Sequence, residues 1–198
     1  MPRIAPATED KTKTRADKLK EVFESHRGER HVIAIRGYPD PDSIACAMAH
    51  AFICASYEIE STILYFDDIS HHENRALVKK LNIEMVRYGE AELVDYDRIA
   101  LVDAQMLELP AELVDVPMMS IVDHHKPQGE VDAEFVDIRE DAGSASSIYA
   151  EYFADAIMTL ERDNPFTGKL SSALLYGIRS DTDDYLSARE IDYRGAAF

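Results

Sequence analysis

The hydrophobic positions of this chain form short unbroken runs separated by longer, partly polar segments. The clearest run spans residues 116–122 (Val-Pro-Met-Met-Ser-Ile-Val) and is too continuous for a strand that exposes one face to solvent. Such a run is typical of a strand buried on both faces, as in a parallel sheet. Comparable runs predict further strands at 31–36, 61–66, 83–86 and 98–103, and an edge strand at 131–138.

The segments between these runs carry helical signals. Apolar spacing and capping residues predict helices over 14–26, 42–57, 71–81, 143–158 and 167–179. Three capping boxes support helix starts, with the pairs Thr14/Asp17, Ser70/Glu73 and Ser187/Glu190. The alternation of strands and helices predicts a three-layer α/β/α fold with a mainly parallel sheet of about five strands.

The same pattern divides the chain into three parts. Residues 1–13 are expected to be a disordered tail, and residues 14–186 to form one α/β domain. Residues 187–198 begin a helix that has room for scarcely two turns. We therefore expect this last segment to lead into a linker or a further C-terminal domain.

Composition narrows the function. The chain has 198 residues and a formal net charge of −17, which argues against binding duplex nucleic acid through bulk charge. It has no signal-peptide core and no run of eighteen apolar residues, so we expect no membrane association. Cys46 and Cys54 lie roughly 12 Å apart on one predicted helix, too far for a disulfide, which favours a cytoplasmic location.

Acids and histidines recur where predicted strands end. Asp40 and Asp42 follow the first strand, Asp103 ends a later one, and Asp123-His124-His125 follows the run at 116–122. Taken singly, each acid is more often a turn residue or a cap. Because the carboxyl ends of parallel strands share one edge, the recurrence predicts a cluster that needs cations.

Two further stretches carry candidate chemistry. Asp181 follows an apolar helix, and the Gly-Ser-rich helix start at Gly143 and Ser144 is either a phosphate cradle or a plain N-cap. His71 and His72 are better explained by a helix start than by a metal site. Oxygen ligands with one imidazole suit Mn²⁺ or Mg²⁺, and a pair of such ions suits phosphoryl hydrolysis.

Five ordered motifs resemble the DHH family of phosphoesterases, over about residues 30 to 185. They are Tyr38–Ala45, Asp103, Asp123-His124-His125, Gly143-Ser144 and Gly177–Thr182. The family includes nanoRNase and pAp-phosphatase proteins, RecJ-type exonucleases, cyclic-dinucleotide phosphodiesterases and manganese pyrophosphatases. Its members usually continue into a substrate-binding domain with a glycine-rich motif, which this sequence lacks.

The resemblance implies roles for individual residues. Asp40 and Asp103 would bind one metal ion, and Asp42, Asp103, His124 and Asp181 would bind the other. His125 would lie beside the scissile phosphate, Asp123 would support the triplet, and Gly143 and Ser144 would contact substrate.

One position departs from the family pattern. The family places a histidine four residues before the first aspartate, and this chain has Arg36 there. A guanidinium has no lone pair for a metal, so the first metal site loses a ligand. Arg36 would instead neutralise the carboxylates or hold a substrate phosphate by a bidentate contact.

The resulting expectation is a metal-dependent phosphoesterase with one or two Mn²⁺ or Mg²⁺ ions. Its substrate would be a short single-stranded oligonucleotide, a pAp-like nucleotide or a cyclic dinucleotide. A pyrophosphatase fits the same motifs, and Arg36 also fits a catalytically degenerate nucleotide-binding module. A homodimer is an open alternative for the assembly.

Overall fold

The computed structural model describes residues 13–90 and 95–198, so almost all of the predicted N-terminal tail lies outside the described residues. The helices are α1 (Arg15–Ser25), α2 (Pro41–Ser56), α3 (His72–Leu81), α4 (Ala145–Ala154), α5 (Pro165–Asp181) and α6 (Glu190–Ala197). The strands are β1 (Arg30–Ile35), β2 (Glu60–Tyr65), β3 (Val86–Arg87), β4 (Arg98–Val102), β5 (Met118–Asp123) and β6 (Phe135–Ile138).

The strands form one sheet in the order β3-β2-β1-β4-β5-β6, and every neighbouring pair is parallel. The predicted α/β fold with a parallel sheet is confirmed, with six strands where about five were expected. The strand order reverses between β1 and β4. Open α/β sheets bind ligands at the carboxyl ends of the strands beside such a reversal.

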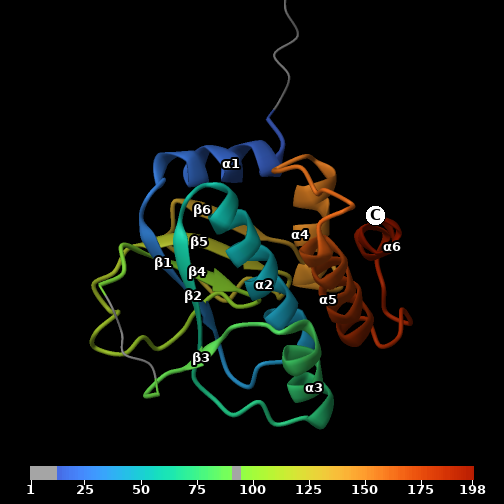
Figure 1. The fold of residues 1–198 in the computed structure, drawn as a ribbon, viewed down its shortest axis with the longest axis horizontal. Helices are drawn as coiled ribbons and strands as arrows, with labels where there is room; N and C mark the ends of the chain where they lie inside the picture. Colours follow the sequence, from blue (N-terminus) through green and yellow to red (C-terminus); the bar gives the residue numbers. More distant parts are fainter. Residues whose placement is uncertain (1–12, 91–94) are drawn as a thin grey trace, which may run out of the picture.

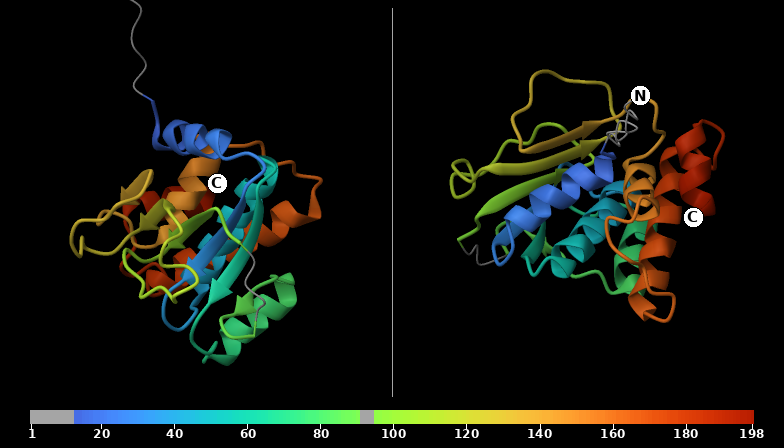
Figure 2. Two further views of the ribbon diagram at one scale, coloured as in Figure 1. Left: turned by 90° about the vertical axis from the view of Figure 1, so that its left-hand side faces the viewer. Right: turned by 90° about the horizontal axis from the view of Figure 1, so that it is seen from above.

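The two faces of the sheet are covered differently (Figure 1, Figure 2). The helices pack on one face over a large core that includes Phe23, Ile44 and Tyr149. On the other face the connecting segments 103–117 and 124–134 cover a smaller core around Leu101, Leu113 and Ile121. Because crossovers between parallel strands are right-handed, reversing the strand order moves the connections to the opposite face.

The helix α2 illustrates how local sequence builds the central packing element. Asp40 is its N-cap, and its carboxylate accepts a hydrogen bond from the Ser43 N–H at 2.8 Å. Pro41 occupies the first turn, where its missing N–H costs nothing. Most of the helix is buried, and it packs against α4, α5 and the sheet, with α5 beside it in Figure 1, which explains its apolar character on nearly every face.

Some predicted element ends are wrong. The helix α3 has His71 as its N-cap without a side-chain capping bond, so the Ser70/Glu73 box does not form. The Ser70 carbonyl instead accepts a hydrogen bond from the Arg75 guanidinium at 3.1 Å. The Ser187/Glu190 box also does not form, because the N-cap of the last helix, α6, is Arg189, whose N–H donates to Asp192 at 2.6 Å.

The edge strands and helix α4 are shorter than predicted. The strand β6 begins at Phe135, β3 contains only two residues, and α4 ends at Ala154. The sheet itself decides where a strand begins, because each edge strand has one neighbour and pairs only where the two backbones run alongside each other.

Two expectations from the sequence concern the cysteines and membrane-spanning helices. Cys46 and Cys54 are both buried and free, as their spacing on one helix predicted. Within the described ranges 13–90 and 95–198, no helix has the length and apolar character needed to cross a membrane.

Candidate metal centre

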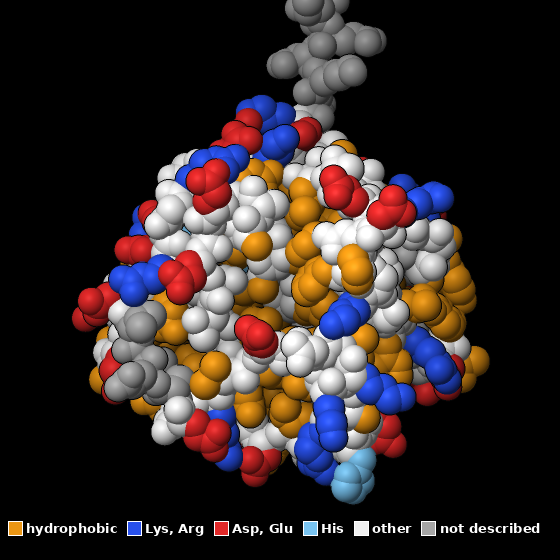
Figure 3. Space-filling model, in the orientation of Figure 1, with side chains coloured by type: hydrophobic (Ala, Val, Ile, Leu, Met, Phe, Trp, Pro, Cys, Tyr) orange, Lys and Arg blue, Asp and Glu red, His pale blue; other side chains and the backbone are white. Residues whose placement is uncertain are grey.

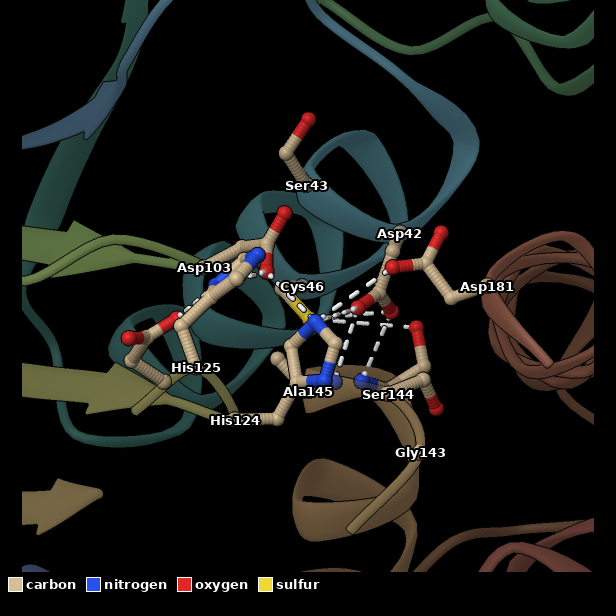
Figure 4. A network of polar contacts seen from close by, with 12 residues as sticks. Asp42, Ser43, Cys46, Asp103, His124, His125, Gly143, Ser144, Ala145 and Asp181 are labelled. Carbon is tan, nitrogen blue, oxygen red and sulfur yellow. Dashed lines mark hydrogen bonds and ion pairs between the residues drawn. The ribbon is translucent and has the colours of Figure 1, made fainter. Parts of the chain in front are cut away.

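Three predicted carboxylate ligands converge on the fourth, the imidazole of His124, at the carboxyl edge of the sheet (Figure 4). His124 follows β5, Asp103 follows β4, Asp42 lies in the first turn of α2, and Asp181 ends α5. The Nε2 atom of His124 lies 3.3 Å from an Asp181 oxygen, 3.4 Å from an Asp103 oxygen and 3.9 Å from an Asp42 oxygen. The four residues predicted for one metal site are therefore brought together.

Asp42 is held by the N-terminus of α4. Its two carboxylate oxygens accept the N–H groups of Ala145 at 2.7 Å and Ser146 at 2.8 Å. A helix N-terminus offers free N–H groups and a favourable dipole, so it orients a carboxylate well. The fully buried Asp42 thus has one preferred orientation, with His124 within 4 Å.

Gly177 lets α5 approach this arrangement closely. A Cβ atom at position 177 would lie 2.3 Å from the Ser146 hydroxyl and 3.1 Å from the Asp42 backbone. Any larger residue would push α5 away and would move Asp181 with it. The glycine of the Gly177–Thr182 motif therefore serves helix packing at the site.

Asp103 has a left-handed backbone conformation, with a φ of 54°. A residue other than glycine pays about 1–3 kcal/mol for such a conformation, and such strain concentrates at functional sites. The Asp103 N–H donates to the Val122 carbonyl at 2.8 Å, which ties the turn after β4 to β5. This turn directs the carboxylate towards His124.

The carboxylates of the cluster shift one another's pKa values because they are buried close together. Burial, together with the charge of Asp181, raises the pKa of Asp42 to about 7. Burial and the Asp42 carboxylate raise the pKa of Asp103 well above its ordinary value. Burial lowers the pKa of His124, but the carboxylates of Asp103 and Asp181 outweigh it and raise that pKa to about 11. The carboxylates therefore require a neutralising positive charge.

The residues fit a divalent cation. Two overlapping trios, Asp42/His124/Asp181 and Asp103/His124/His125, present ligand atoms that lie within 4.8 Å of one another. The buried atoms Nε2 of His124 and Oδ1 of Asp103 make no hydrogen bond with the part of the chain that is described. Buried polar atoms are normally paired, and a metal ion would satisfy both atoms at once.

Asp123 and His125 form a separate supporting pair. The Nδ1 atom of His125 lies 2.8 Å from one Asp123 oxygen, and the Gln105 amide donates to the other at 2.6 Å. Burial acts to raise the pKa of Asp123, but the hydrogen bonds from His125 and Gln105 lower it. Asp123 is fully buried, whereas about half of the His125 side chain is exposed. His125 can therefore meet a ligand while Asp123 fixes its orientation.

Asp40 and Arg36 lie at the margin of this cluster. Burial raises the pKa of Asp40, and Asp181 adds to the effect, so Asp40 belongs to the same electrostatic group. One Asp40 oxygen already caps α2, which leaves the other for a second ion. Arg36 is exposed at the end of β1 and makes no ion pair with any described carboxylate.

At the predicted phosphate cradle, Gly143 and Ser144 form hydrogen bonds with other groups of this chain. The Gly143 N–H donates to the Asp192 carboxylate at 3.0 Å, and the Ser147 N–H donates to the Ser144 hydroxyl at 3.2 Å. With Asp42 bound at the next two N–H groups, this helix start orients carboxylates. Substrate binding by Gly143 and Ser144 stays a prediction.

Sequence reasoning missed two residues that support the site. Gln105 donates to Asp123 and to the carbonyls of His125 and Lys126, and its own oxygen accepts from the Gln128 N–H. Asp192 reaches from α6 to Gly143 and to the Ser147 hydroxyl, at 2.6 Å from the latter. Gln105 could have been identified from its position two residues after Asp103, whereas no feature of the sequence pointed to Asp192.

Comparison with known proteins identifies the class. Residues 31–178 match the model of the DHH family, N-terminal domain. The uncharacterised protein MJ1633 of Methanocaldococcus jannaschii is 33% identical over 162 residues, which are 81% of this chain and 32% of that protein. This chain therefore spans about a third of the length of that curated relative.

Two solved structures share the fold. A proposed family II inorganic pyrophosphatase from Methanococcus jannaschii has 24% identity and a TM-score of 0.58, over 85% of this chain and 53% of that one. An exopolyphosphatase-related protein from Bacteroides fragilis has 13% identity and a TM-score of 0.69, over 96% and 57% respectively. The chain belongs to the DHH family, as its five motifs predicted.

Proposed function

We propose that this chain is the catalytic domain of a divalent-metal-dependent phosphoesterase acting on a small nucleotide. The substrate would be a short oligonucleotide, a pAp-like nucleotide or a cyclic dinucleotide. The observation that carries this proposal is the buried Nε2 atom of His124, which makes no hydrogen bond within residues 13–90 and 95–198 and faces the carboxylates of Asp42, Asp103 and Asp181. Membership of a family of phosphoesterases supports the same reaction class.

The ligand set favours Mn²⁺, with Mg²⁺ as the alternative. Asp42, Asp103, His124 and Asp181 would hold one ion, and Asp40 with Asp103 would hold a second. An imidazole beside carboxylates suits Mn²⁺ better than it suits Mg²⁺. When bound, such ions polarise phosphoryl oxygens and lower the pKa of water at the site.

The remaining residues handle the substrate. Asp123 accepts from Nδ1 of His125, which leaves Nε2 of the partly exposed ring for a phosphoryl or leaving-group oxygen. Arg36, four residues before Asp40, would hold a phosphate through its two-pronged guanidinium. Its exposure and lack of an ion pair within residues 13–90 and 95–198 support this role.

A second candidate is hydrolysis of pyrophosphate. The similarity in fold to the proposed pyrophosphatase favours it, and the same ligands would serve. A third candidate is nucleotide binding without turnover, which Arg36 in place of a metal-binding histidine favours. A cytoplasmic location and a homodimer stay predictions alongside all three.

One experiment separates the three candidates. The protein would be assayed with Mn²⁺ or Mg²⁺ against pyrophosphate, 5′-phosphorylated dinucleotides and cyclic dinucleotides, with His124→Ala as the inactive control. We expect nucleotide products that require the metal ion and His124. Phosphate release from pyrophosphate alone would establish the second candidate, and nucleotide binding without products would establish the third.

A further inference from the structure

A cavity lies at the same sheet edge as the metal centre. Its volume is about 640 Å³, and its lining residues are Arg36, Gly37, Phe66, Asp67, Met106, Leu107 and Glu108. These residues come from three connections, those that follow β1, β2 and β4. Figure 3 shows the face seen in Figure 1, where apolar side chains gather near the middle, whereas this cavity is lined by the connections that follow the carboxyl ends of the strands.

We propose that this cavity binds the base of the nucleotide substrate, with the base stacked on Phe66. The phosphate would then point towards Arg36 and the metal centre. This inference rests on the proposed function, because it assigns the organic half of the substrate whose phosphate that function hydrolyses.

The position of the cavity relative to the metal centre supports one ligand spanning both. Met106 follows Asp103 by three residues, so their Cα atoms lie at most about 11 Å apart. The strands β2 and β5 are separated by β1 and β4, which places their ends roughly 14 Å apart. An extended nucleotide covers such a span, whereas pyrophosphate occupies only one end of it.

The apolar part of the lining suits a planar base. Phe66 is partly exposed, and its ring packs against Tyr88 with a centroid distance of 5.5 Å, which restricts its orientation. Met106 leaves 49% of its surface exposed, although it directly follows the buried Gln105. Proteins that bind single-stranded nucleic acids place bases on aromatic rings of this kind.

The charged part of the lining orients the ligand. Among the described residues that line it, Arg36 is the one cationic side chain, and Asp67 and Glu108 are exposed carboxylates. Carboxylates repel a phosphate but accept hydrogen bonds from the exocyclic amines and ring N–H groups of bases. The lining thus matches a base at Asp67 and Glu108 and a phosphate at Arg36, and it does not match an anion that fills the cavity.

Equilibrium binding tests the base subsite without requiring turnover. Calorimetric titrations in the presence of Mn²⁺ would compare GMP and AMP with ribose 5-phosphate, which carries the same phosphate and no base. We expect at least one nucleotide to bind tenfold or more tightly than ribose 5-phosphate. Removing an aromatic stacking partner costs about tenfold in affinity, so Phe66→Ala should remove most of this preference and leave ribose 5-phosphate binding unchanged.

Three further variants control for folding and for the phosphate. Phe66→Leu keeps the apolar packing against Tyr88 and should show the same selective loss. Arg36→Gln should weaken nucleotides and ribose 5-phosphate alike. Leu175→Ala, which is 44% exposed on α5 and outside the cavity, should change neither affinity.

The outcomes separate this inference from the proposed function. Equal affinity of the wild-type protein for both nucleotides and ribose 5-phosphate would overturn the base subsite, even if nucleotides are hydrolysed. A base preference that Phe66→Leu leaves intact would also overturn it. A Phe66-dependent preference in a protein that hydrolyses no nucleotide would uphold the subsite and refute the hydrolase.

Discussion

Clusters of acids and histidines lie at both ends of the parallel sheet, and they differ in how their charges are matched. At the carboxyl end, three carboxylates surround the single imidazole of His124. At the amino end, two glutamates pair with two imidazoles and a guanidinium, whether or not each imidazole is charged, in the set His26, Glu29, His31, Arg98 and Glu134.

Hydrogen bonding follows the same division. At the amino end, His26 lies 3.1 Å from Glu29 and 2.9 Å from Glu134, and His31 lies 3.1 Å from Glu29. The remaining buried nitrogen of His31 has no partner in the described part of the chain, and burial lowers the pKa of His31. That imidazole is therefore neutral, and its free nitrogen is an acceptor rather than a charge.

The pKa of Glu29 at the amino end and the pKa values of Asp42 and Asp103 at the carboxyl end shift in opposite directions. Burial acts to raise the pKa of Glu29, but its hydrogen bonds with His26 and His31 lower it overall. Burial and like charge raise the pKa values of Asp42 and Asp103. The same residue types thus stabilise the fold at the amino end, whereas at the carboxyl end they leave a negative charge that a bound cation would neutralise. Charge imbalance marks the functional cluster better than residue type does.

The largest expected effect comes from Asp103→Asn. Mn²⁺ affinity and hydrolysis should each fall at least about a hundredfold, because even residues that only support a metal ligand cost 10–100-fold. In EDTA the variant should melt at a higher temperature than the wild-type protein, because the substitution removes a buried carboxylate that the neighbouring carboxylates repel. Asp115→Asn, an exposed acid in the 103–117 connection, is the control. A lower melting temperature for Asp103→Asn in EDTA would contradict the charge imbalance.

The opposite response is expected at the amino end. Glu29→Gln should lower the free energy of unfolding by about 1.5–3 kcal/mol, the usual contribution of hydrogen bonds to a charged group. Mn²⁺ affinity should not change, because this cluster lies at the other end of the sheet. Urea unfolding would be measured beside Glu24→Gln, an exposed control on α1. Stability equal to that of the control would show that the pairing contributes nothing.

The pH dependence sharpens this comparison. The folded state lowers the pKa of Glu29 below its ordinary value of 4.5. The contribution of Glu29 to the free energy of unfolding is therefore complete above pH 4.5 and is lost as the pH falls through the lowered pKa. The stability difference between wild-type and Glu29→Gln should therefore be constant near neutral pH and shrink below about pH 4.5. Urea midpoints from pH 7 to pH 3.5 would measure it. A difference that grows on acidification would reverse the assigned sign.

The smallest expected effect concerns Asp192, which supports the carboxyl-end cluster from α6. Asp192→Asn should weaken Mn²⁺ binding by about tenfold, because the start of α4 that orients Asp42 loses part of its support. Calorimetric Mn²⁺ titration would be compared with Asp155→Asn, an exposed residue at the other end of α4. A lower melting temperature with unchanged Mn²⁺ affinity would limit Asp192 to stabilising the fold.

The local sequence pattern alone predicts most of the strands and helices of this protein. Buried strands and helices appear as hydrophobic runs, and the carboxyl ends of parallel strands meet at one edge. The acids after β1 and β4 and the Asp123-His124-His125 triplet could therefore be placed together before any contact was known. Asp181 was placed with them because it ends an apolar helix and matches a DHH motif.

The tertiary structure decided which partner each polar group takes. Asp42 binds N–H groups 103 and 104 residues away, and Asp192 binds the Gly143 N–H at a separation of 49 residues. Such pairings follow from the relative positions of packed helices, and no pattern within a single element encodes them. The sequence therefore determined the elements and the sheet edge where the acids gather. Packing decided that α4 holds Asp42, that Gln105 holds Asp123, and that His124 is left without a hydrogen-bond partner among the described residues.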